Sequence, residues 1–271
     1  MFMSGLEAHY STRDIEVRIL AGIRAAGLDP EQRLSPEELG ALDHFHTGGL
    51  RATRELLELA QIRADDRVLD IGAGLAGSAR LLASSIGCDI ECIEMSADYC
   101  AGAALLNRIT GLEDRINVRQ GSALDLPFPD NAFDVVWMQN VGMNIADKRS
   151  LYGEIRRVLK PGGRYAFQEM AAGQAKTSYF PLPWATDPAD NYLVSAEDMC
   201  SLLSESGLVA EVFEDTSDAH LSGTIANATP ASPGQLSLAV FVDDLAQKGA
   251  NARRSLEEGQ VRLVRGVFRA N

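Results

Sequence analysis

Glycines and carboxylates follow two predicted strands of this sequence. The segment Gly72–Gly77 (GAGLAG) comes directly after the predicted strand Arg67–Ile71 and opens a helical pattern. Glycines at such a turn permit a tight bend and let a ligand approach the backbone. Glu94 ends the next predicted strand, where a carboxylate can accept hydrogen bonds from both hydroxyls of a ribose. This pattern predicts a nucleoside site, and by itself it also fits a dinucleotide.

Asp70, two positions before the first glycine, distinguishes between these two possible classes of ligand. A carboxylate there attracts a cationic amine and repels a pyrophosphate. Residues 121–128 (GSALDLPF) follow another predicted strand, at a place suited to contacts with an adenine edge. Residues 159–163 (LKPGG) are predicted to end an amphipathic helix before a further strand. Together these segments favour a nucleoside that carries a cationic amine.

The elements that must position these residues alternate between strands and helices. Strands are predicted at residues 67–71, 89–94, 115–120, 133–138, 165–170 and 209–214, with helical patterns after the first, second, fourth and fifth of them. This alternation predicts right-handed crossovers and an α/β fold with a parallel, doubly wound sheet. Ligands bind such sheets beyond the carboxyl ends of the strands, which is where the residues above lie.

The sequence outside this alternation divides into a helical start and two irregular stretches. Residues 1–62 are predicted to form an N-terminal helical cap, in which Ser35 and Glu38 make a capping box, and residues 63–271 the main domain. The irregular stretches 171–194 and 217–236 are long enough to be lids. The tail is predicted to hold a helix over 240–256 and, over 261–268, a final edge strand or a helical extension.

These motifs in combination resemble the class I S-adenosylmethionine-dependent methyltransferases over about residues 67–170. The resemblance implies a seven-stranded, mostly parallel Rossmann-like sheet with a terminal antiparallel hairpin, and S-adenosyl-L-methionine as the cofactor. Asp70 and the Gly72 backbone would lie near the methionine amine. The other cofactor residues that it implies are Ala73 and Gly74 in the glycine loop, Glu94 at the ribose, Met95, Ser122 and Ala123 at the adenine, and Gln139 at the methionine moiety. Many relatives have Gly-Asp-Ala where this chain has Gly121-Ser122-Ala123, so the Ser122 hydroxyl replaces a carboxylate.

The resemblance implies methyl transfer to a small molecule. Residues 133–140 (FDVVWMQN) and 145–148 (IADK) are similar to glycine/sarcosine/dimethylglycine N-methyltransferases, and the same stretch is similar to sterol and natural-product methyltransferases. The predicted reaction is therefore N-methylation of an amine such as sarcosine or dimethylglycine, or O- or C-methylation of a natural product or sterol-like compound. The alternatives are an NAD-dependent oxidoreductase and a methyltransferase-like subunit that binds the cofactor without catalysis.

Candidate acceptor residues come from three places. His46 precedes a paired glycine and is the candidate general base, although a packed or surface histidine explains it equally well. Asn140, Met143 and Asn144 follow the fourth predicted strand. Tyr179 and Trp184 belong to an aromatic and proline-rich cluster in the first lid, which forms either an apolar substrate wall or a small satellite core. Trp137 is predicted to be core.

Composition limits the partners. The chain has 271 residues, 46% of them hydrophobic, and a net charge of −13, which argues against nucleic acids and anionic membranes. We find no apolar run near the ~18 residues of a membrane span and no basic start typical of a signal peptide. Cys88, Cys92, Cys100 and Cys200 form no CxxC pair, which predicts a cytoplasmic protein without a metal site. The oligomeric state stays open, a homo-oligomer included.

Overall fold

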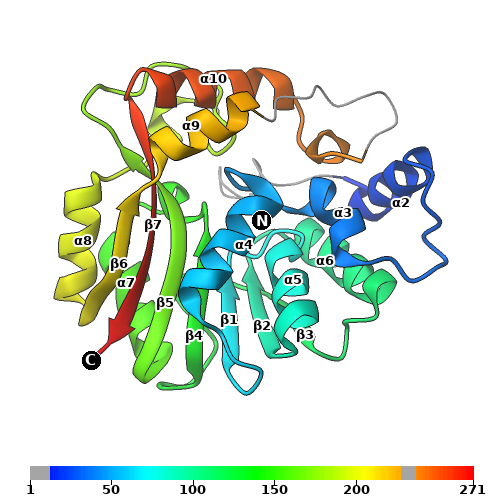
Figure 1. Cartoon of the computed structure of the whole chain (residues 1–271), viewed down its shortest axis with the longest axis horizontal. Coiled ribbons are helices and arrows are strands. Elements are labelled where there is room, and N and C mark those ends of the chain that lie inside the picture. The colour runs from blue at the N-terminus through cyan, green and yellow to red at the C-terminus, as the bar shows by residue number, and fades with distance from the viewer. Residues whose placement is uncertain (1–12, 227–235) are drawn as a thin grey trace, which may run out of the picture.

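A seven-stranded sheet in the order β3-β2-β1-β4-β5-β7-β6 forms the centre of the computed structural model, which describes residues 13–226 and 236–271 (Figure 1). The first five strands are parallel, and β7 runs antiparallel to both of its neighbours. The mostly parallel sheet with a terminal antiparallel hairpin is therefore confirmed. The strands are β1 (Arg67–Ile71), β2 (Asp89–Glu94), β3 (Ile116–Gln120), β4 (Phe133–Gln139), β5 (Leu159–Ala172), β6 (Leu208–Asp215) and β7 (Val261–Ala270).

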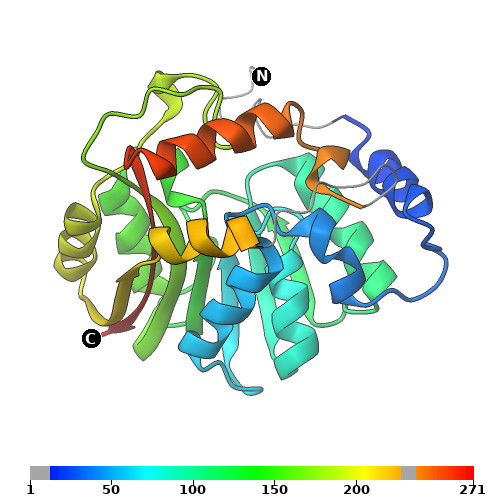
Figure 2. The same ribbon diagram turned by 45° about the horizontal axis from the view of Figure 1, so that its top comes forward.

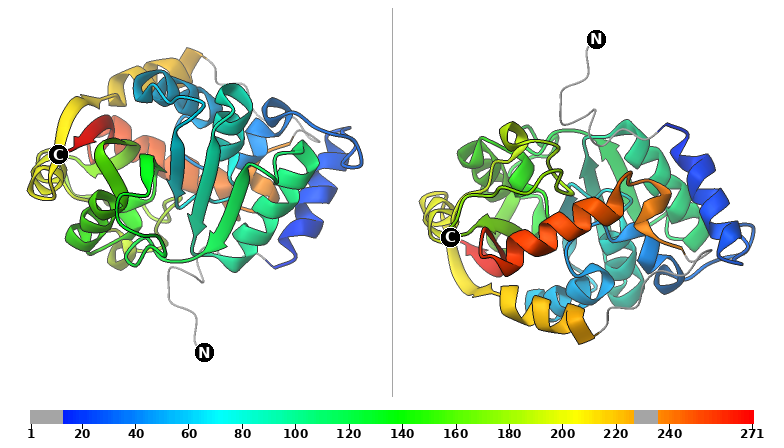
Figure 3. Two further views of the ribbon diagram at one scale, coloured as in Figure 1. Left: turned by 90° about the horizontal axis from the view of Figure 1, so that it is seen from below. Right: turned by 90° about the horizontal axis from the view of Figure 1, so that it is seen from above.

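Helices cover both faces of this sheet (Figure 3). One face packs against α7 (Lys148–Val158) and α8 (Ala196–Glu205), and the other against α4 (Gly49–Ala60) and α5 (Gly77–Ile86). Successive strand residues point to opposite faces, so every residue of β4 from Val135 to Met138 is buried on one side or the other. The prediction that Trp137 is core is confirmed, since its side chain is completely buried on the α4–α5 face.

The N-terminal helices pack on one end of the sheet layers. α2 (Ile15–Ala25) and α3 (Pro36–Asp43) join α6 (Ala97–Thr110) in an apolar cluster of their own. The predicted capping box begins α3: the Ser35 hydroxyl accepts a hydrogen bond from the Glu38 N–H at 3.3 Å, and the Glu38 carboxylate accepts one from the Ser35 N–H at 2.8 Å. This arrangement brings the end of α3 close to the carboxyl ends of the strands.

The connection between β6 and β7 forms a roof over those strand ends (Figure 2). It contains α9 (Ser217–Ala226), the short 3-10 helix η3 (Leu238–Val240) and α10 (Leu245–Glu257). The prediction of an irregular stretch over 217–236 was wrong for its first ten residues, which are helical; residues 227–235 lie outside the described part of the chain. The first lid matches the expectation better, because only η2 (Pro188–Asp190) interrupts it after β5 ends at Ala172.

Two further predictions need correction. β7 was expected at an edge, but it lies between β5 and β6, and β6 is the edge strand. The reason is that the last strand inserts antiparallel beside β5, a pairing that its own sequence does not specify. The segment LKPGG ends α7 at Val158 as predicted, but β5 already begins at Leu159 and not at Tyr165. Within the described ranges, no helix has the length and apolar character needed to cross a membrane.

Candidate functional site

A cavity of about 810 Å³ lies at the carboxyl ends of the strands. Its volume falls in the upper part of the roughly 300–1,000 Å³ range of small-molecule sites. The loops after β1, β2, β3 and β4, the 3-10 helix η1 (Gly142–Asn144), the first lid, α9 and α10 all contribute to its lining. The residues predicted from the sequence that line it are His46, Asp70, Gly72, Ala73, Gly74, Glu94, Met95, Ser122, Ala123, Gln139, Asn140, Met143, Asn144 and Trp184.

Tyr179 is the exception among the predicted site residues. Its hydroxyl donates a hydrogen bond to the Glu258 carboxylate at 2.7 Å, and the Arg254 guanidinium lies 4.1 Å from its ring centroid. These two contacts tie the ring to the end of α10, and Tyr179 is not part of the cavity lining. The prediction that Tyr179 contacts the acceptor is therefore corrected.

The glycine loop has the geometry that only glycine tolerates well. Gly72 has φ +67°, and a Cβ there would lie 2.4 Å from a methyl carbon of Val141. Gly74 has φ +57°, and a Cβ there would meet nothing within 4 Å, so this position faces open space. The N–H groups of the loop are already used: those of Gly72 and Ala73 donate to the Ile93 carbonyl, and that of Gly74 donates to Glu94. Such a loop has few amides left to bind a pyrophosphate.

Asp70 is an unpaired acid at the base of the cavity. Its side chain is almost fully buried, and within the described part of the chain its Oδ2 atom has no hydrogen-bond partner. Burial and the nearby Glu94 carboxylate raise the pKa of Asp70 to about 8. A buried acceptor without a partner is costly unless a ligand satisfies it. Asp70 therefore fits a cationic amine, which would supply both the charge and the donor.

Glu94 is held firmly at the end of β2. Its carboxylate accepts hydrogen bonds from the Gly74 N–H at 2.9 Å and the Ser96 N–H at 2.8 Å. Burial raises its pKa, and the backbone hydrogen bonds from Ser96, Gly74 and Met95 partly offset this rise. Each carboxylate oxygen has two lone pairs, so both oxygens can accept further hydrogen bonds from a ligand. This geometry suits a pair of ribose hydroxyls.

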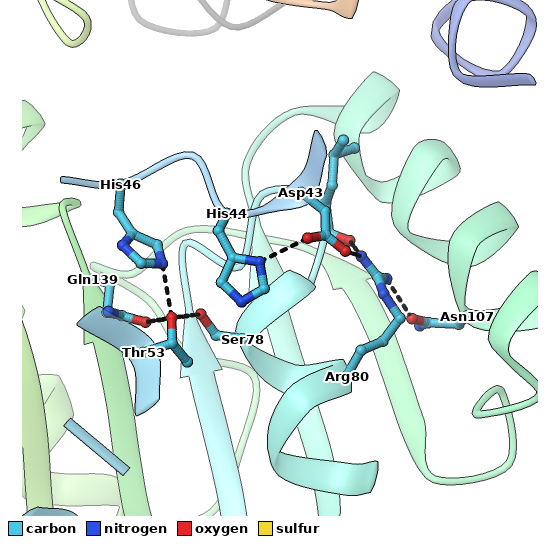
Figure 4. A network of polar contacts seen from close by, with 9 residues as sticks. Asp43, His44, His46, Thr53, Ser78, Arg80, Asn107 and Gln139 are labelled. Atoms are coloured by element: carbon cyan, nitrogen blue, oxygen red, sulfur yellow. Dashed lines mark hydrogen bonds and ion pairs between the residues drawn. The ribbon is translucent and has the colours of Figure 1, made fainter. Parts of the chain in front are cut away.

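Gln139 has a fixed amide orientation (Figure 4). Its Oε1 atom accepts hydrogen bonds from the Trp137 indole at 3.0 Å, from the Ser78 hydroxyl at 2.8 Å and from the Thr53 hydroxyl at 3.3 Å. Because an indole N–H only donates, the oxygen must be the atom that faces Trp137. The Nε2 group of Gln139 is buried without a partner in the described structure, so it is available to donate to a ligand carboxylate.

His46 lines the cavity beside this network. Its Nε2 atom lies 3.0 Å from the Thr53 hydroxyl, and its Nδ1 atom lies 3.5 Å from the Thr47 carbonyl. Burial and the neighbouring His44 lower the pKa of His46 to about 3. A group with such a pKa is uncharged at neutral pH and a poor proton acceptor. The geometry thus favours a packing and hydrogen-bonding role over the general-base role predicted from the sequence.

A buried ion pair joins the end of α3 to α5 beside the cavity. The Arg80 guanidinium donates to the Asp43 carboxylate at 2.6 Å and to the Asn107 amide oxygen at 2.8 Å, and His44 Nδ1 donates to Asp43 at 2.7 Å (Figure 4). The side chains of Asp43 and Arg80 are fully buried. Burial raises the pKa of Asp43, but Arg80 and His44 outweigh this effect and hold the pKa below 3.8.

Glu169 positions the loop after β4, a role that no sequence motif indicated. Its carboxylate accepts hydrogen bonds from the Val141 N–H at 2.9 Å and the Gly142 N–H at 3.0 Å. Burial raises its pKa to about 7, although these hydrogen bonds and Lys148 oppose the rise. Lys148 donates in turn to the carbonyls of Ile145 and Tyr192, which joins the first lid to this loop.

Apart from His220, a weaker candidate base, the cavity-lining residues of the roof were also missed. α10 lines the cavity with Leu245, Gly249, Ala252 and Leu256, and α9 with His220 and Leu221. The spacing along α10 is that of one helix face, which could have been found as a periodic stripe. The surface that this helix face covers could not be predicted, because a periodic stripe does not indicate what it packs against.

The unsatisfied groups at the base of the cavity fit one end of S-adenosylmethionine. Asp70 would hold the amine, the Gln139 amide the carboxylate, and Glu94 the ribose hydroxyls. These three side chains and Gly74 all line the cavity. The space beside Gly74 is open, so a ligand can approach the backbone closely there. A dinucleotide fits less well, because the loop amides are occupied and two acids would face its pyrophosphate.

Comparisons with known proteins agree with this site. Residues 69–167 match the model of a family described as a methyltransferase domain. Residues 69–167 are thus similar to a methyltransferase domain. The matched residues of the domain run from β1 to β5 and include the glycine loop, Glu94 and Gln139. The dinucleotide-dependent oxidoreductase alternative finds no support in these comparisons.

Relatives of the methyltransferase domain act on different acceptors according to their names. The chain is 39% identical over 131 residues to a glycine/sarcosine/dimethylglycine N-methyltransferase of Actinopolyspora halophila, which is 48% of this chain and 23% of that protein. It is 33% identical over 132 residues to a probable chloroplastic tocopherol O-methyltransferase of Oryza sativa subsp. japonica, which is 47% of this chain and 36% of that protein. The chain thus spans well under half the length of these relatives.

The fold is shared with solved structures. Phosphoethanolamine N-methyltransferase 2 of Haemonchus contortus, solved in complex with S-adenosyl-L-methionine, superposes with a TM-score of 0.70 at 20% sequence identity. The superposition covers 96% of this chain and 60% of that chain. It extends beyond the methyltransferase domain matched by the family model.

Proposed function

We propose that this protein transfers a methyl group from S-adenosylmethionine to a small-molecule acceptor. The observation that carries the proposal is a pair of buried groups, Asp70 Oδ2 and Gln139 Nε2, that have no partner among the described residues and lie beside the anchored carboxylate of Glu94. These groups complement the amine, the carboxylate and the ribose of that molecule. When bound, S-adenosylmethionine supplies a sulfonium methyl group that a nucleophile displaces in line.

The chain's own residues then contribute binding, alignment and exclusion of water. Asp70, Gln139 and Glu94 would hold the cofactor in one orientation. We also propose that residues 1–62 act as a helical cap, and that the first lid together with α9 and α10 closes the acceptor side. Alignment of two bound reactants alone can lower a barrier by about 7–11 kcal/mol. A strong base is therefore not required, which agrees with the low pKa of His46.

Calorimetry with S-adenosylhomocysteine tests the first part of the proposal. We expect saturable binding to the folded protein, none with NAD, and binding weakened by roughly 30-fold or more by Asp70→Asn. Absence of binding to folded protein would overturn the proposal. Incubation with isotopically labelled S-adenosylmethionine and a panel of neutral and charged acceptors tests transfer. Binding without transfer to any acceptor would instead support the non-catalytic subunit.

The finer chemistry is also part of the proposal. The relatives' names include N- and O-methyltransferases, so the acceptor atom must be found by mass spectrometry of the product. A soluble metabolite in the cytoplasm is the partner that we propose, since the acidic chain has little attraction for nucleic acids or anionic membranes.

A further inference from the structure

One side of the cavity is an apolar wall built by four separate segments. It comprises η1, β5, the first lid and the roof helices, and its members belong to a single apolar cluster. Trp184 is nearly fully buried there, and its indole N–H donates to Asn191 at 2.9 Å, which fixes the ring against the wall. The wall residues are Met143, Met170, Trp184, Leu221, Ala252 and Leu256.

The charges of the cavity do not favour an anion. Five acids line it, namely Asp43, Asp70, Glu94, Asp147 and Asp190. Asp43 is paired with Arg80, and Asp70 and Glu94 are the groups proposed to hold the cofactor, which leaves Asp147 and Asp190. Arg253 is the single lysine or arginine among the described lining residues, and it is already paired with Glu257 at 2.8 Å. A carboxylate or phosphate is normally recognised by an arginine or lysine that is available to it. The described lining residues offer such an acceptor no available arginine or lysine.

The two histidines of the lining do not change this balance. Burial and His44 lower the pKa of His46 to about 3. Burial, Arg51 and Arg253 lower the pKa of His220 below its usual 6.5. Both rings are therefore neutral at physiological pH. A cationic acceptor is also disfavoured, because the sulfonium of the donor would repel it at close range.

We propose that the acceptor site binds an uncharged, apolar small molecule and excludes acceptors that carry a carboxylate or a phosphate. The inference rests on the proposed function, since it assigns the acceptor class to the same cavity. On this inference, the acceptor class of this chain differs from that of relatives named for sarcosine, dimethylglycine or phosphoethanolamine, although the sequences or folds are similar.

Trp184 provides a direct readout of acceptor binding. The chain has two tryptophans, and Trp137 is completely buried in the sheet. We would titrate the complex with S-adenosylhomocysteine separately with geraniol, geranyl phosphate and dimethylglycine and follow the tryptophan fluorescence. Geraniol and geranyl phosphate share a carbon skeleton and differ in charge. Trp184→Phe controls for changes that do not arise at the wall. We expect geraniol to bind at least tenfold more tightly than either anion.

Gly249 offers a substitution that tests the location. It lies on α10 at the lining, and a Cβ there would meet nothing within 4 Å. Gly249→Leu should project into the cavity without a clash and should suit the helix better than glycine. Its matched control is Gly153→Leu on α7, an exposed position that is equally open and lies away from the cavity. We expect a tenfold or greater loss of geraniol affinity only in Gly249→Leu, with unchanged affinity for S-adenosylhomocysteine in both variants.

The outcomes separate this inference from the proposed function. Failure of S-adenosylhomocysteine to bind would remove the proposed function itself. Normal binding of that molecule with tighter binding of geranyl phosphate or dimethylglycine than of geraniol would overturn only the acceptor class. The same conclusion holds if geraniol does not bind, or if Gly249→Leu leaves its affinity unchanged.

Discussion

The indole Nε1 of Trp137 donates a hydrogen bond to Oε1 of Gln139, two residues further along the same strand, at 3.0 Å. Residues two apart on a strand point to the same face, so the buried indole sets the orientation of an amide at the edge of the cavity. The hydroxyls of Thr53 and Ser78 donate to the same oxygen. One acceptor thus satisfies donors from α4, α5 and β4.

Replacing that acceptor should therefore be costly. We expect Gln139→Met to lower the free energy of unfolding by about 1–3 kcal/mol, because it leaves buried donors without an acceptor. Urea denaturation measures the change. Ser78→Ala is the control, since it removes one donor and keeps the acceptor, and it should cost no more than about 1.5 kcal/mol. Equal stability of wild type and Gln139→Met would show that the network is not structurally important.

The pKa of Asp70, about 8 in the folded protein against an ordinary 3.8, makes two pH effects predictable. Between these values the folded state binds more protons than the unfolded state, so stability of the ligand-free protein should fall as pH rises from 4 to 8. Affinity for S-adenosylhomocysteine should rise between pH 6 and 8, because the carboxylate must be ionised to pair with the amine.

Asp70→Asn should flatten both of these profiles. It should also weaken binding of S-adenosylhomocysteine by roughly 30-fold or more, since losing one partner of a buried charge pair costs about 2 kcal/mol or more. Thermal unfolding and calorimetry over the pH series are the measurements. A variant that keeps the wild-type pH dependence of affinity would place the amine elsewhere.

Gly72 and Val141 form a contact that a side chain at residue 72 would disrupt. A Cβ there would lie 2.4 Å from Val141 at a φ of +67°. We expect Gly72→Ala to lower the free energy of unfolding by about 2–4 kcal/mol, from the backbone conformation and the overlap together. Gly74→Ala, at a similar φ but with open space, should cost only about 1–2 kcal/mol.

A second substitution separates the two causes. Val141→Ala removes the overlapping methyl groups, so it should recover part of the loss caused by Gly72→Ala. Denaturation of the two single variants and the double variant gives the coupling. Strict additivity would mean that the overlap contributes nothing and that only the backbone conformation matters.

The buried pair of Asp43 and Arg80 should be important to stability. Removing one partner leaves an uncompensated buried charge, so Asp43→Asn should cost about 3–5 kcal/mol. The folded pKa of Asp43 lies below 3.8, so its contribution is fully present above about pH 4 and is lost as pH falls further. Asp43→Asn should therefore unfold with a weaker acid dependence than wild type.

An exposed ion pair is the matched control for this experiment. Arg149 and Glu205 are 71% and 52% exposed, and such pairs contribute about 0–1 kcal/mol. Glu205→Gln should therefore change stability little. If Asp43→Asn behaved like Glu205→Gln, the buried pair would not be holding α3 against α5.

His46 gives a test of whether the proposed methyl transfer needs a general base. With a pKa of about 3, its ring stays neutral from pH 5 upward. We expect His46→Asn to lower kcat less than tenfold and to leave its pH dependence unchanged, whereas loss of a general base costs about 10²–10⁴-fold. Initial rates across pH 5–9 with the acceptor found by the panel are the measurement. A hundredfold loss together with a vanished acidic limb would restore His46 as the base.

The part of the cavity that the strand ends form could be predicted largely from the sequence, for a local reason. Asp70, the glycine loop and Glu94 each directly precede or follow the end of a strand, and parallel strands bring their carboxyl ends to one edge. Order along the chain therefore implies proximity in space. The same logic placed Gln139 and Asn140 at the cavity, because they end and follow β4.

The side of the cavity formed by the first lid and the roof could not be predicted from the sequence, because only the tertiary structure determines it. Tyr179 lies outside the cavity lining, where it contacts Glu258 and Arg254, residues some eighty positions later in the chain. Nothing in the sequence around the aromatic cluster indicates these contacts. The roof over the cavity depends on β7 inserting between β5 and β6, which is a choice of strand pairing. The low pKa of His46 and the high pKa of Asp70 arise from burial, which is a property of the packed chain and not of a residue's neighbours in sequence.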